Sequence, residues 1–484
     1  MKSKQSVTKN YIYNLLYQIL VLILPLITTP YISRVLGAEN IGIYSYTISI
    51  ATYFVLFGSL GIALYGQREI AYNQKNKKKY SVIFREIVIL RIITMSISVL
   101  IFYFIFVNGN QYQIYYKILT LEIIGNCIDI SWFFLGLEEF KKTVTRNIII
   151  KLISVLCIFI FIKNQNDLYL YFLIYVFSTL IGNGSLWLYL PKFLGKVELK
   201  ELNIFRHLKP TISLFIPQIA IQIYTLLDRT MVGAIISDKS EVGYYDQGQK
   251  IVKMLLAVIT SMGTVMLPRI ANTFATGDRN MVKNYMNKSF NLVFALAFPL
   301  IFGIIAVSKA FVPVFFGPGY DKVAILMSVI SPIILLIGIS NVTGTQYLLP
   351  TKRQKEYTIS VFCGAIINFI MNICLIWNYG AIGASIGTVI AELTVTLVQI
   401  HFVKNDFDFK EIFKSAKNYL FSSLIMFIIC LFIETKIKSN LVSTISQVGV
   451  GIIIYIIILL LLKDKFVIEI INKFIKIGEK NGTN

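Results

Sequence analysis

Fourteen apolar segments, of which the fifth is short, are candidates to cross a lipid bilayer as helices along this chain of 484 residues. A helix needs about 20 apolar residues to span the hydrocarbon core. The expected spans lie near residues 11–33, 41–64, 82–107, 114–136, 147–162, 167–190, 211–236, 250–268, 289–308, 323–349, 358–378, 381–403, 417–434 and 442–462. Because 56% of the residues are hydrophobic and only 15% are charged, a water-soluble globule of this length could not bury them. The sequence therefore predicts an all-α polytopic membrane protein.

Positive charge alternates between the segments that connect these spans. The chain has 46 Lys and Arg against 25 Asp and Glu, a formal net charge of +21. Most of the cations lie in the N-terminus, in every second connection and in the C-terminal tail, as Lys77, Lys192 and Lys352 do. Cytoplasmic loops collect Lys and Arg. The alternation therefore supports the count of fourteen, predicts that both termini are cytoplasmic, and explains the net charge without a nucleic-acid partner.

The connections leave no room for an extramembrane catalytic domain, since the longest covers only residues 191–210. The chain has no Gly-x-x-x-x-Gly-Lys motif that would bind a nucleotide phosphate. Its five cysteines lie in apolar stretches without a C-x-x-C pair, and its two histidines, His207 and His401, are far apart. These patterns do not support a metal site or a disulfide framework. We expect a protein without catalytic residues, metal or cofactor, and not an enzyme.

A weak internal repeat relates the two halves of the chain. The matching positions are Arg34 and Arg229, Gly37 and Gly233, Gly42 and Gly243, and, further on, Gly61 and Gly263. The repeat predicts two parallel lobes of six helices, related by an axis along the membrane normal, and transporters built this way bind substrate between the repeats. The expected parts are a cytoplasmic N-terminus (1–10), an N-lobe (11–190), a cytoplasmic linker (191–210), a C-lobe (211–403), two further helices (404–462) and a cytoplasmic tail (463–484).

Polar residues recur within the spans at helical spacing, as Glu122, Asn126 and Asp129 do in the fourth span. Ionisable residues at this depth are costly and usually face the interior of the bundle. A cavity lined by cations suits an anionic substrate, above all phosphate, which Arg binds through two parallel hydrogen bonds. The candidate cavity cations are Arg34, Arg91, Arg229 and Lys253, and the candidate polar or coupling groups are Glu122, Asn126, Asp129, Gln222, Asp228 and Glu392.

These residues also have a simpler explanation, because polar side chains join membrane helices through hydrogen bonds. That structural role is favoured for Ser, Thr and Asn, whereas both roles stay open for Arg91, Arg229 and Lys253. Arg34 and Arg229 belong to the repeated motif, so they could be structural residues at the ends of the lobes. The acidic residues could balance the cations or carry a coupling proton or sodium ion.

Prolines interrupt several spans, and each one removes a helix hydrogen bond and marks a kink. Rocking transporters need such bends, although membrane helices carry proline freely. The candidate hinges are Pro25 and Pro30 in the first span and Pro217 in the seventh. The first span is the strongest of these candidates.

Several motifs together resemble the polysaccharide transporter family, the Wzx-type flippases of the MOP superfamily. The motifs are Leu-Pro-Leu-Ile-Thr-Thr-Pro-Tyr-Ile-Ser-Arg-Val-Leu-Gly at 24–37, Gly-Ile-Tyr at 42–44, Gln-Tyr-Leu-Leu-Pro at 346–350, Gly364 to Asn372, and Gly380 to Glu392. Each motif alone is a weak indication of the family, but their order and spacing together are fairly specific. The resemblance covers essentially the whole chain. The resemblance implies a MOP/MATE-like fold of two six-helix lobes around a central cavity, with two extra C-terminal helices.

The resemblance also implies a function. Such a protein moves an undecaprenyl-pyrophosphate-linked oligosaccharide, a repeat unit for capsule, O-antigen or teichoic-type polymer, from the inner to the outer leaflet of the bacterial plasma membrane by alternating access. The partners that it implies are the lipid-linked oligosaccharide, membrane lipids, and the polymerase and chain-length machinery. It also implies that the protein is a monomer. Coupling to H⁺, Na⁺ or the membrane potential would drive the transport.

Two other functions remain open at this point. A MATE-like cation-coupled drug exporter would use the same scaffold, but it would fit a cavity dominated by Asp and Glu, whereas the polar stripes here include several cations. A membrane polysaccharide polymerase would need large outer loops with catalytic arginines, and the outer loops here are short and nearly uncharged. The flippase is the favoured prediction.

Overall fold

The computed structural model describes residues 4–464 and 466–469, with the backbone alone for residues 4–19, 22, 199, 216–218, 220–221 and 223–224. Within this part of the chain the regular elements are all helices, and no strand occurs. The start of the expected N-terminus (1–3), most of the expected tail (463–484) and the side chain of Pro217 lie outside the described residues. The described residues confirm the prediction of an all-α protein.

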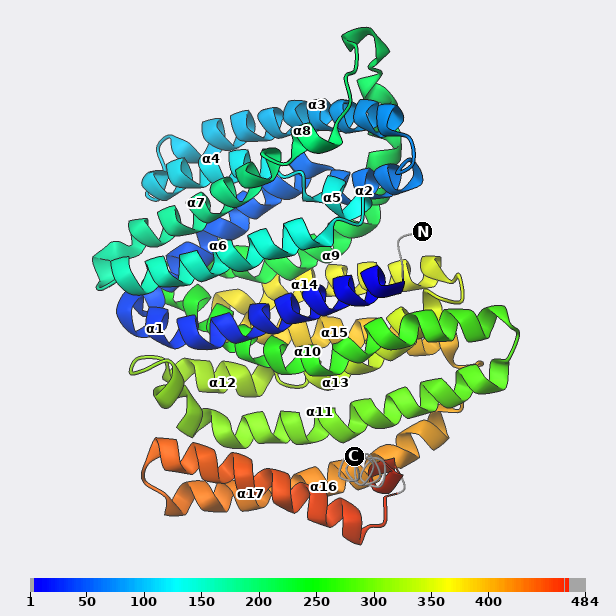
Figure 1. Ribbon diagram of the computed structural model, residues 1–484. Coiled ribbons are helices and arrows are strands. Elements are labelled where there is room, and N and C mark those ends of the chain that lie inside the picture. The colour runs from blue at the N-terminus through cyan, green and yellow to red at the C-terminus, as the bar shows by residue number, and fades with distance from the viewer. Residues whose placement is uncertain (1–3, 465, 470–484) are drawn as a thin grey trace, which may run out of the picture. The chain divides into compact units, whose positions relative to one another are not determined.

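The chain divides into two compact units, one ending at Gly243 and the other beginning at Tyr244. In the first unit α1 packs against α4 and α6, and α7 packs against the same two helices; Figure 1 shows α3, α4, α6 and α7 running alongside one another. Its helices are α1 (Lys4–Ser59), α2 (Ile62–Tyr72), α3 (Lys77–Phe102), η1 (Tyr103–Val107), α4 (Gln113–Cys127), α5 (Ser131–Gly136), α6 (Phe140–Phe161), η2 (Gln165–Asp167), α7 (Leu168–Trp187), α8 (Leu190–Phe193), η3 (Leu199–Glu201), η4 (Ile204–His207), α9 (Leu208–Ile235) and the first residues of α10 (Ser240–Ala275).

The second unit begins within α10 and contains the remaining helices. Here α14 packs along α15, while α16 packs against both α11 and α17. The helices are α11 (Arg279–Phe315), α12 (Asp321–Ile330), α13 (Ile333–Ser340), η5 (Asn341–Leu348), α14 (Gln354–Tyr379), α15 (Ala381–Val403), α16 (Phe409–Lys436) and α17 (Asn440–Leu461). The expected division into an N-lobe, a linker, a C-lobe and two appended helices remains a prediction.

Twelve helical segments in the described residues are long and apolar enough to cross a membrane. The sequence predicts fourteen spans. The first two of them form the long α1 here, and the seventh (211–236) lies in α9, several of whose side chains are outside the described residues. The fifth expected span (147–162) begins seven residues later than the helix does. Its helix, α6, begins at Phe140 and so includes Arg146.

The two halves of α1 are separated by Gly37, whose φ of 78° and ψ of 167° are not helical. This φ lies in the region that only glycine adopts without strain. The kink is held to the loop after α6, because the amide of Asn40 donates to the Gln165 carbonyl oxygen at 2.8 Å and Tyr31 donates to Ile162 O at 2.5 Å. Glycine therefore allows the kink that divides the first two expected spans.

Two glycines that match in the internal repeat, Gly42 of α1 and Gly243 of α10, lie directly against each other. A Cβ added to Gly42 would overlap the carbonyl oxygen of Lys239, and a Cβ added to Gly243 would overlap that of Ala38. The backbones of α1 and of the start of α10 approach so closely that neither position has room for a side chain.

The fourth span is interrupted between α4 and α5, at residues 128–130. Such an interruption leaves backbone carbonyls without their usual helical donors, which is costly inside a membrane unless other groups bond to them. Three side chains supply those bonds: Asn183 Nδ2 donates to Gly125 O at 2.8 Å, Arg91 Nη2 to Asn126 O at 2.7 Å, and Trp187 Nε1 to Ile128 O at 2.7 Å. The interruption is therefore a stable part of the fold, and it places Asp129 beside a cavity.

Candidate functional site

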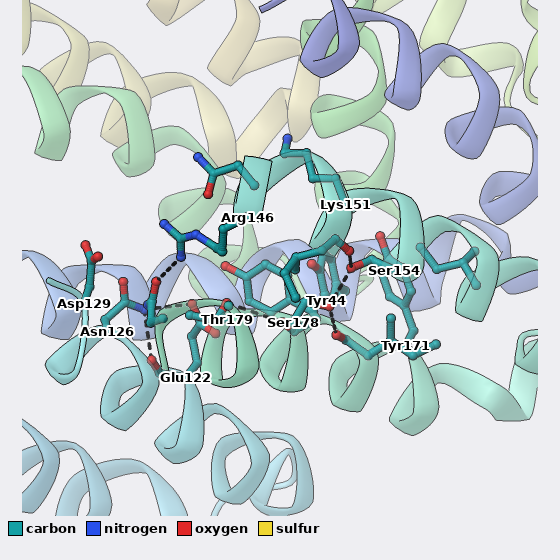
Figure 2. A pocket seen from close by; sticks show the side chains of 17 residues that line it. Tyr44, Glu122, Asn126, Asp129, Arg146, Lys151, Ser154, Tyr171, Ser178 and Thr179 are labelled. Atoms are coloured by element: carbon teal, nitrogen blue, oxygen red, sulfur yellow. Dashed lines mark hydrogen bonds between the residues drawn. The ribbon is translucent and has the colours of Figure 1, made fainter. Parts of the chain in front are cut away.

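A cavity of about 460 Å³ lies inside the first unit, among α1, α4, α6 and α7 (Figure 2). Its polar lining comes from four elements: Tyr44 from α1; Glu122, Asn126 and, just beyond the helix, Asp129 from α4; Arg146, Asn147, Lys151 and Ser154 from α6; and Tyr171, Tyr175, Ser178, Thr179 and Asn183 from α7. Polar groups at this depth in a membrane helix bundle are expensive unless they face a cavity or one another. The concentration of so many in one place marks it as the candidate functional site.

The acidic wall of the cavity is the stripe that the helical spacing in the fourth span predicts. Glu122 is only 7% exposed, and its Oε1 accepts a hydrogen bond from Asn126 Nδ2 at 2.9 Å. The hydroxyl groups of Thr179 and Tyr175 lie beside the same carboxylate. Asp129 accepts from the backbone N–H of Ser131 at 2.9 Å, which orients its carboxylate next to the helix interruption. All three predicted residues thus line one cavity.

The basic wall of the cavity comes from α6, with half-buried Arg146 and Lys151. Arg146 Nη1 donates to Asn183 Oδ1 at 2.7 Å, and Asn183 in turn donates to Gly125 O, so α6, α7 and α4 are joined through one amide. Lys151 lies near the middle of α6, where a charged side chain is most costly in a membrane. Two carboxylates and two cations therefore face one another across the cavity.

Aromatic side chains close another part of the cavity. The rings of Tyr44 and Tyr171 are 4.6 Å apart at their centroids, and those of Tyr44 and Tyr175 are 6.0 Å apart. Ser154 and Ser178 share a hydrogen bond of 2.6 Å between α6 and α7. The lining thus combines hydroxyls, amides and ring faces with four charges, a set that can donate and accept many hydrogen bonds.

Arg91 lies behind the cavity wall and is not part of the lining. It is 3% exposed, and both Nε and Nη2 donate to the carbonyl oxygen of Asn126, at 3.1 and 2.7 Å. This contact satisfies a carbonyl at the helix interruption and fixes the segment that carries Asn126 and Asp129. The geometry supports the structural role for Arg91, and direct contact with a substrate remains a prediction.

The other predicted residues of the first unit lie outside the cavity lining. Arg34 is exposed near the kink at Gly37. In α9, Asp228 is buried, Arg229 is half-buried and Gln222 is exposed. The predicted hinges Pro25 and Pro30 both lie inside α1.

The second unit holds Lys253 and Glu392. Lys253 Nζ donates to Gln249 Oε1 at 2.9 Å, Gln249 Nε2 donates to the Tyr245 hydroxyl at 2.8 Å, and that hydroxyl lies 3.1 Å from Thr388 Oγ1. Glu392 is buried one helical turn beyond Thr388. These contacts form a polar chain that links α10 to α15.

Sequence reasoning missed Arg146 and Lys151, although a signal for one of them was present. Asn147, Lys151 and Ser154 recur at intervals of four and three, the same spacing that identifies the stripe in the fourth span. The fifth expected span begins at residue 147, so Arg146 falls in the connection before it. The four-residue spacing alone would have found Lys151.

Removing the indole N–H that bonds to the helix interruption should destabilise the protein. We expect Trp187→Phe to lower the free energy of unfolding by about 1–3 kcal/mol, because the half-buried carbonyl of Ile128 would lose its donor. Thermal unfolding of the purified protein in detergent measures this loss. The matched control is Trp377→Phe, since Trp377 is 68% exposed on α14 and should tolerate the change; equal effects of the two substitutions would contradict the prediction.

The chain is similar to proteins of polysaccharide export and to transporters of known structure. Residues 7–274 match the family described as polysaccharide biosynthesis protein, and residues 149–448 match the lipid II flippase MurJ family. A relative named "Putative O-antigen transporter" from Escherichia coli (strain K12) is 28% identical over 413 residues, which cover 84% of this chain and 98% of the relative.

Two solved structures share the fold. The lipid II flippase MurJ in an inward closed conformation superposes with a TM-score of 0.73 at 19% identity, over 94% of this chain and 99% of that one. An inward-facing multidrug resistance MATE family transporter of the MOP superfamily gives a TM-score of 0.62 at 11% identity, over 81% of this chain and 96% of that one. The MOP-type helical fold is confirmed.

Proposed function

Since the chain belongs to the polysaccharide biosynthesis protein family, as a Wzx-type flippase of the MOP superfamily, we propose that it translocates an undecaprenyl-pyrophosphate-linked oligosaccharide from the inner to the outer leaflet. The observation that carries the proposal is the family match over residues 7–274, together with a near full-length relative named as an O-antigen transporter. The protein acts in the bacterial plasma membrane with both termini cytoplasmic, and it performs no catalysis.

The cavity of the first unit supports this proposal by its chemistry. A lipid-linked oligosaccharide carries hydroxyls and a pyrophosphate, and the cavity offers amides and hydroxyls next to Arg146 and Lys151. Cations bind phosphate oxygens through charge-assisted hydrogen bonds, about twice as strong as neutral ones. In this proposal the two cations contact the pyrophosphate or an acidic sugar, and the predicted cations Arg34, Arg91, Arg229 and Lys253 guide or position it.

In this proposal the acidic residues couple transport to the uptake of an ion. Glu122 and Asp129 face Arg146 and Lys151 in one cavity, so uptake of a proton or sodium ion by a carboxylate would change the charge that the cargo meets. Asp228 and Glu392 are further candidates for ion uptake, and Gln222 is a polar candidate beside them in the sequence-based set; all three lie outside this cavity. The coupling ion would thus favour one conformation of the transporter over the other.

Alternating access requires a helix that bends, and α1 contains two prolines. We expect Pro25→Ala to reduce translocation severalfold while the folded amount of protein stays within about twofold, because the substitution restores a helix hydrogen bond and trims only a half-buried ring. Surface polymer and the amount of protein in the membrane, measured in the same cells, check this. Unchanged transport would contradict the hinge role.

The test of the function is to find where lipid-linked repeat units accumulate in a strain that lacks the gene. We expect the units to accumulate in the cytoplasmic leaflet with loss of surface polymer, and this gene to restore both. Single units in the outer leaflet without polymer would instead indicate a polymerase. Normal polymer with altered drug sensitivity would indicate a drug exporter.

A further inference from the structure

The segment between α8 and α9 runs along one end of α3 and is bonded to it at two places. At the first, Arg85 Nη1 donates to the carbonyl oxygen of Val197 at 2.8 Å and Nη2 to that of Gly195 at 3.2 Å. The N–H of Gly195 donates to Ser81 Oγ at 2.9 Å. Residues 194–207 are called the strap below. These bonds hold the backbone of the strap, so they do not depend on its side chains.

At the second place the strap surrounds a buried carboxylate, Glu86, whose side chain is fully inaccessible to solvent. Its Oε1 accepts from the backbone N–H of Asn203 at 2.6 Å. Its Oε2 accepts from Arg206 Nε at 3.1 Å and from Arg206 Nη2, and it lies 2.8 Å from His207 Nε2. The hydroxyl of Tyr65 in α2 lies 2.7 Å from Nδ1 of the same histidine.

These contacts decide how easily the strap can leave α3. A carboxylate in a dry site costs several kcal/mol unless opposite charges and hydrogen bonds compensate it. The hydrogen-bond partners of the Glu86 side chain among the described residues all come from the strap. Detaching the strap would therefore leave the Glu86 carboxylate buried without its hydrogen-bond partners. It would also break the hydrogen bonds from Arg85 to the carbonyl oxygens of Gly195 and Val197.

We propose that Glu86 is a positioning residue that fastens the strap permanently to the first unit. The predicted linker between the lobes (191–210) is then not a flexible tether but a rigid part of that unit. The movement of transport is taken up after His207, in α9, where the sequence places the predicted hinge Pro217. This role in transport rests on the proposed function, whereas the fastening itself does not.

A disulfide across the first contact tests the permanence of the strap. A Cβ on Gly195 would lie 3.6 Å from Ser81 Oγ, so two cysteines at these positions are close enough for their sulfur atoms to bond. We expect the oxidised Ser81→Cys/Gly195→Cys protein to translocate lipid-linked units within about twofold of its reduced form. The two single-cysteine variants are the controls for oxidation elsewhere. Loss of translocation on oxidation, restored by reduction, would overturn the proposal.

A second measurement, the rate of proteolysis, does not depend on transport. It therefore tests the fastening of the strap separately from the proposed function. Trypsin cleaves after lysine and arginine, and the strap offers Lys196 and Lys200. Cleavage requires local opening of the backbone, so Glu86→Gln should be cut there at least tenfold faster than the wild type. Glu201→Gln, which removes the exposed ion pair with Lys78, should be cut after Lys196 at nearly the wild-type rate. Equal rates for Glu86→Gln and the wild type would overturn the fastening, whatever the leaflet assay shows.

Discussion

Replacing Gly42 with alanine should cost about 3 kcal/mol of the free energy of unfolding and remove most of the transport activity. The added methyl group would overlap the carbonyl oxygen of Lys239, which belongs to the backbone and cannot turn aside. Overpacking of this kind costs about 1–3 kcal/mol even where neighbouring side chains can adjust. Here the start of α10 would have to move away from α1 as a whole.

Thermal unfolding of the purified protein and surface polymer in complemented cells measure the two effects of Gly42→Ala. Gly449→Ala in α17 is the matched control, since a Cβ there would meet no atom within 4 Å. Gly243→Ala should resemble Gly42→Ala, because its Cβ would overlap the Ala38 carbonyl oxygen in the same contact. The double variant should then lose less than the sum of the single losses, because both changes disrupt one contact. A Gly42→Ala protein as stable as the Gly449→Ala control would refute this account.

The glycine contact illustrates what the sequence could predict and what it could not. The repeat aligns Gly42 with Gly243, but only the folded chain shows that the two positions touch. The same limit applies to Arg91. Its position in a span predicts a buried cation, whereas its partner is the Asn126 carbonyl next to the interruption at residues 128–130, where neither proline nor glycine marks a break.

Periodicity is more informative where one expected span carries the whole pattern. The spacing of Glu122, Asn126 and Asp129 predicts a shared face, and the three residues do line one cavity. What lies opposite that face depends on tertiary packing. The cations that meet these acids come from α6, in the span whose length was hardest to judge, so the pairing of acidic and basic walls could not be predicted from either segment alone.

Lys151 should therefore matter more for transport than the other lysines within the spans. We expect Lys151→Met to lower translocation about tenfold or more, because a charge-assisted hydrogen bond to an anionic cargo contributes about 1.5–3 kcal/mol and 1.4 kcal/mol corresponds to a factor of ten. Methionine preserves the length and apolar stem of the side chain, so the helix should stay folded. Lys151→Arg, which keeps the charge, should retain most of the activity.

The control for Lys151→Met is Lys117→Met, since Lys117 is an exposed residue of α4 outside the cavity lining. Translocation of lipid-linked units in reconstituted vesicles, normalised to the amount of inserted protein, separates an effect on transport from an effect on folding. A loss for Lys151→Met that Lys151→Arg does not share would show that positive charge on α6 is required in the cavity. If Lys151→Met and Lys117→Met both transport at the wild-type rate, the cargo does not meet this charge. The acidic stripe on α4 would then face the basic residues of α6 only to hold the helices together.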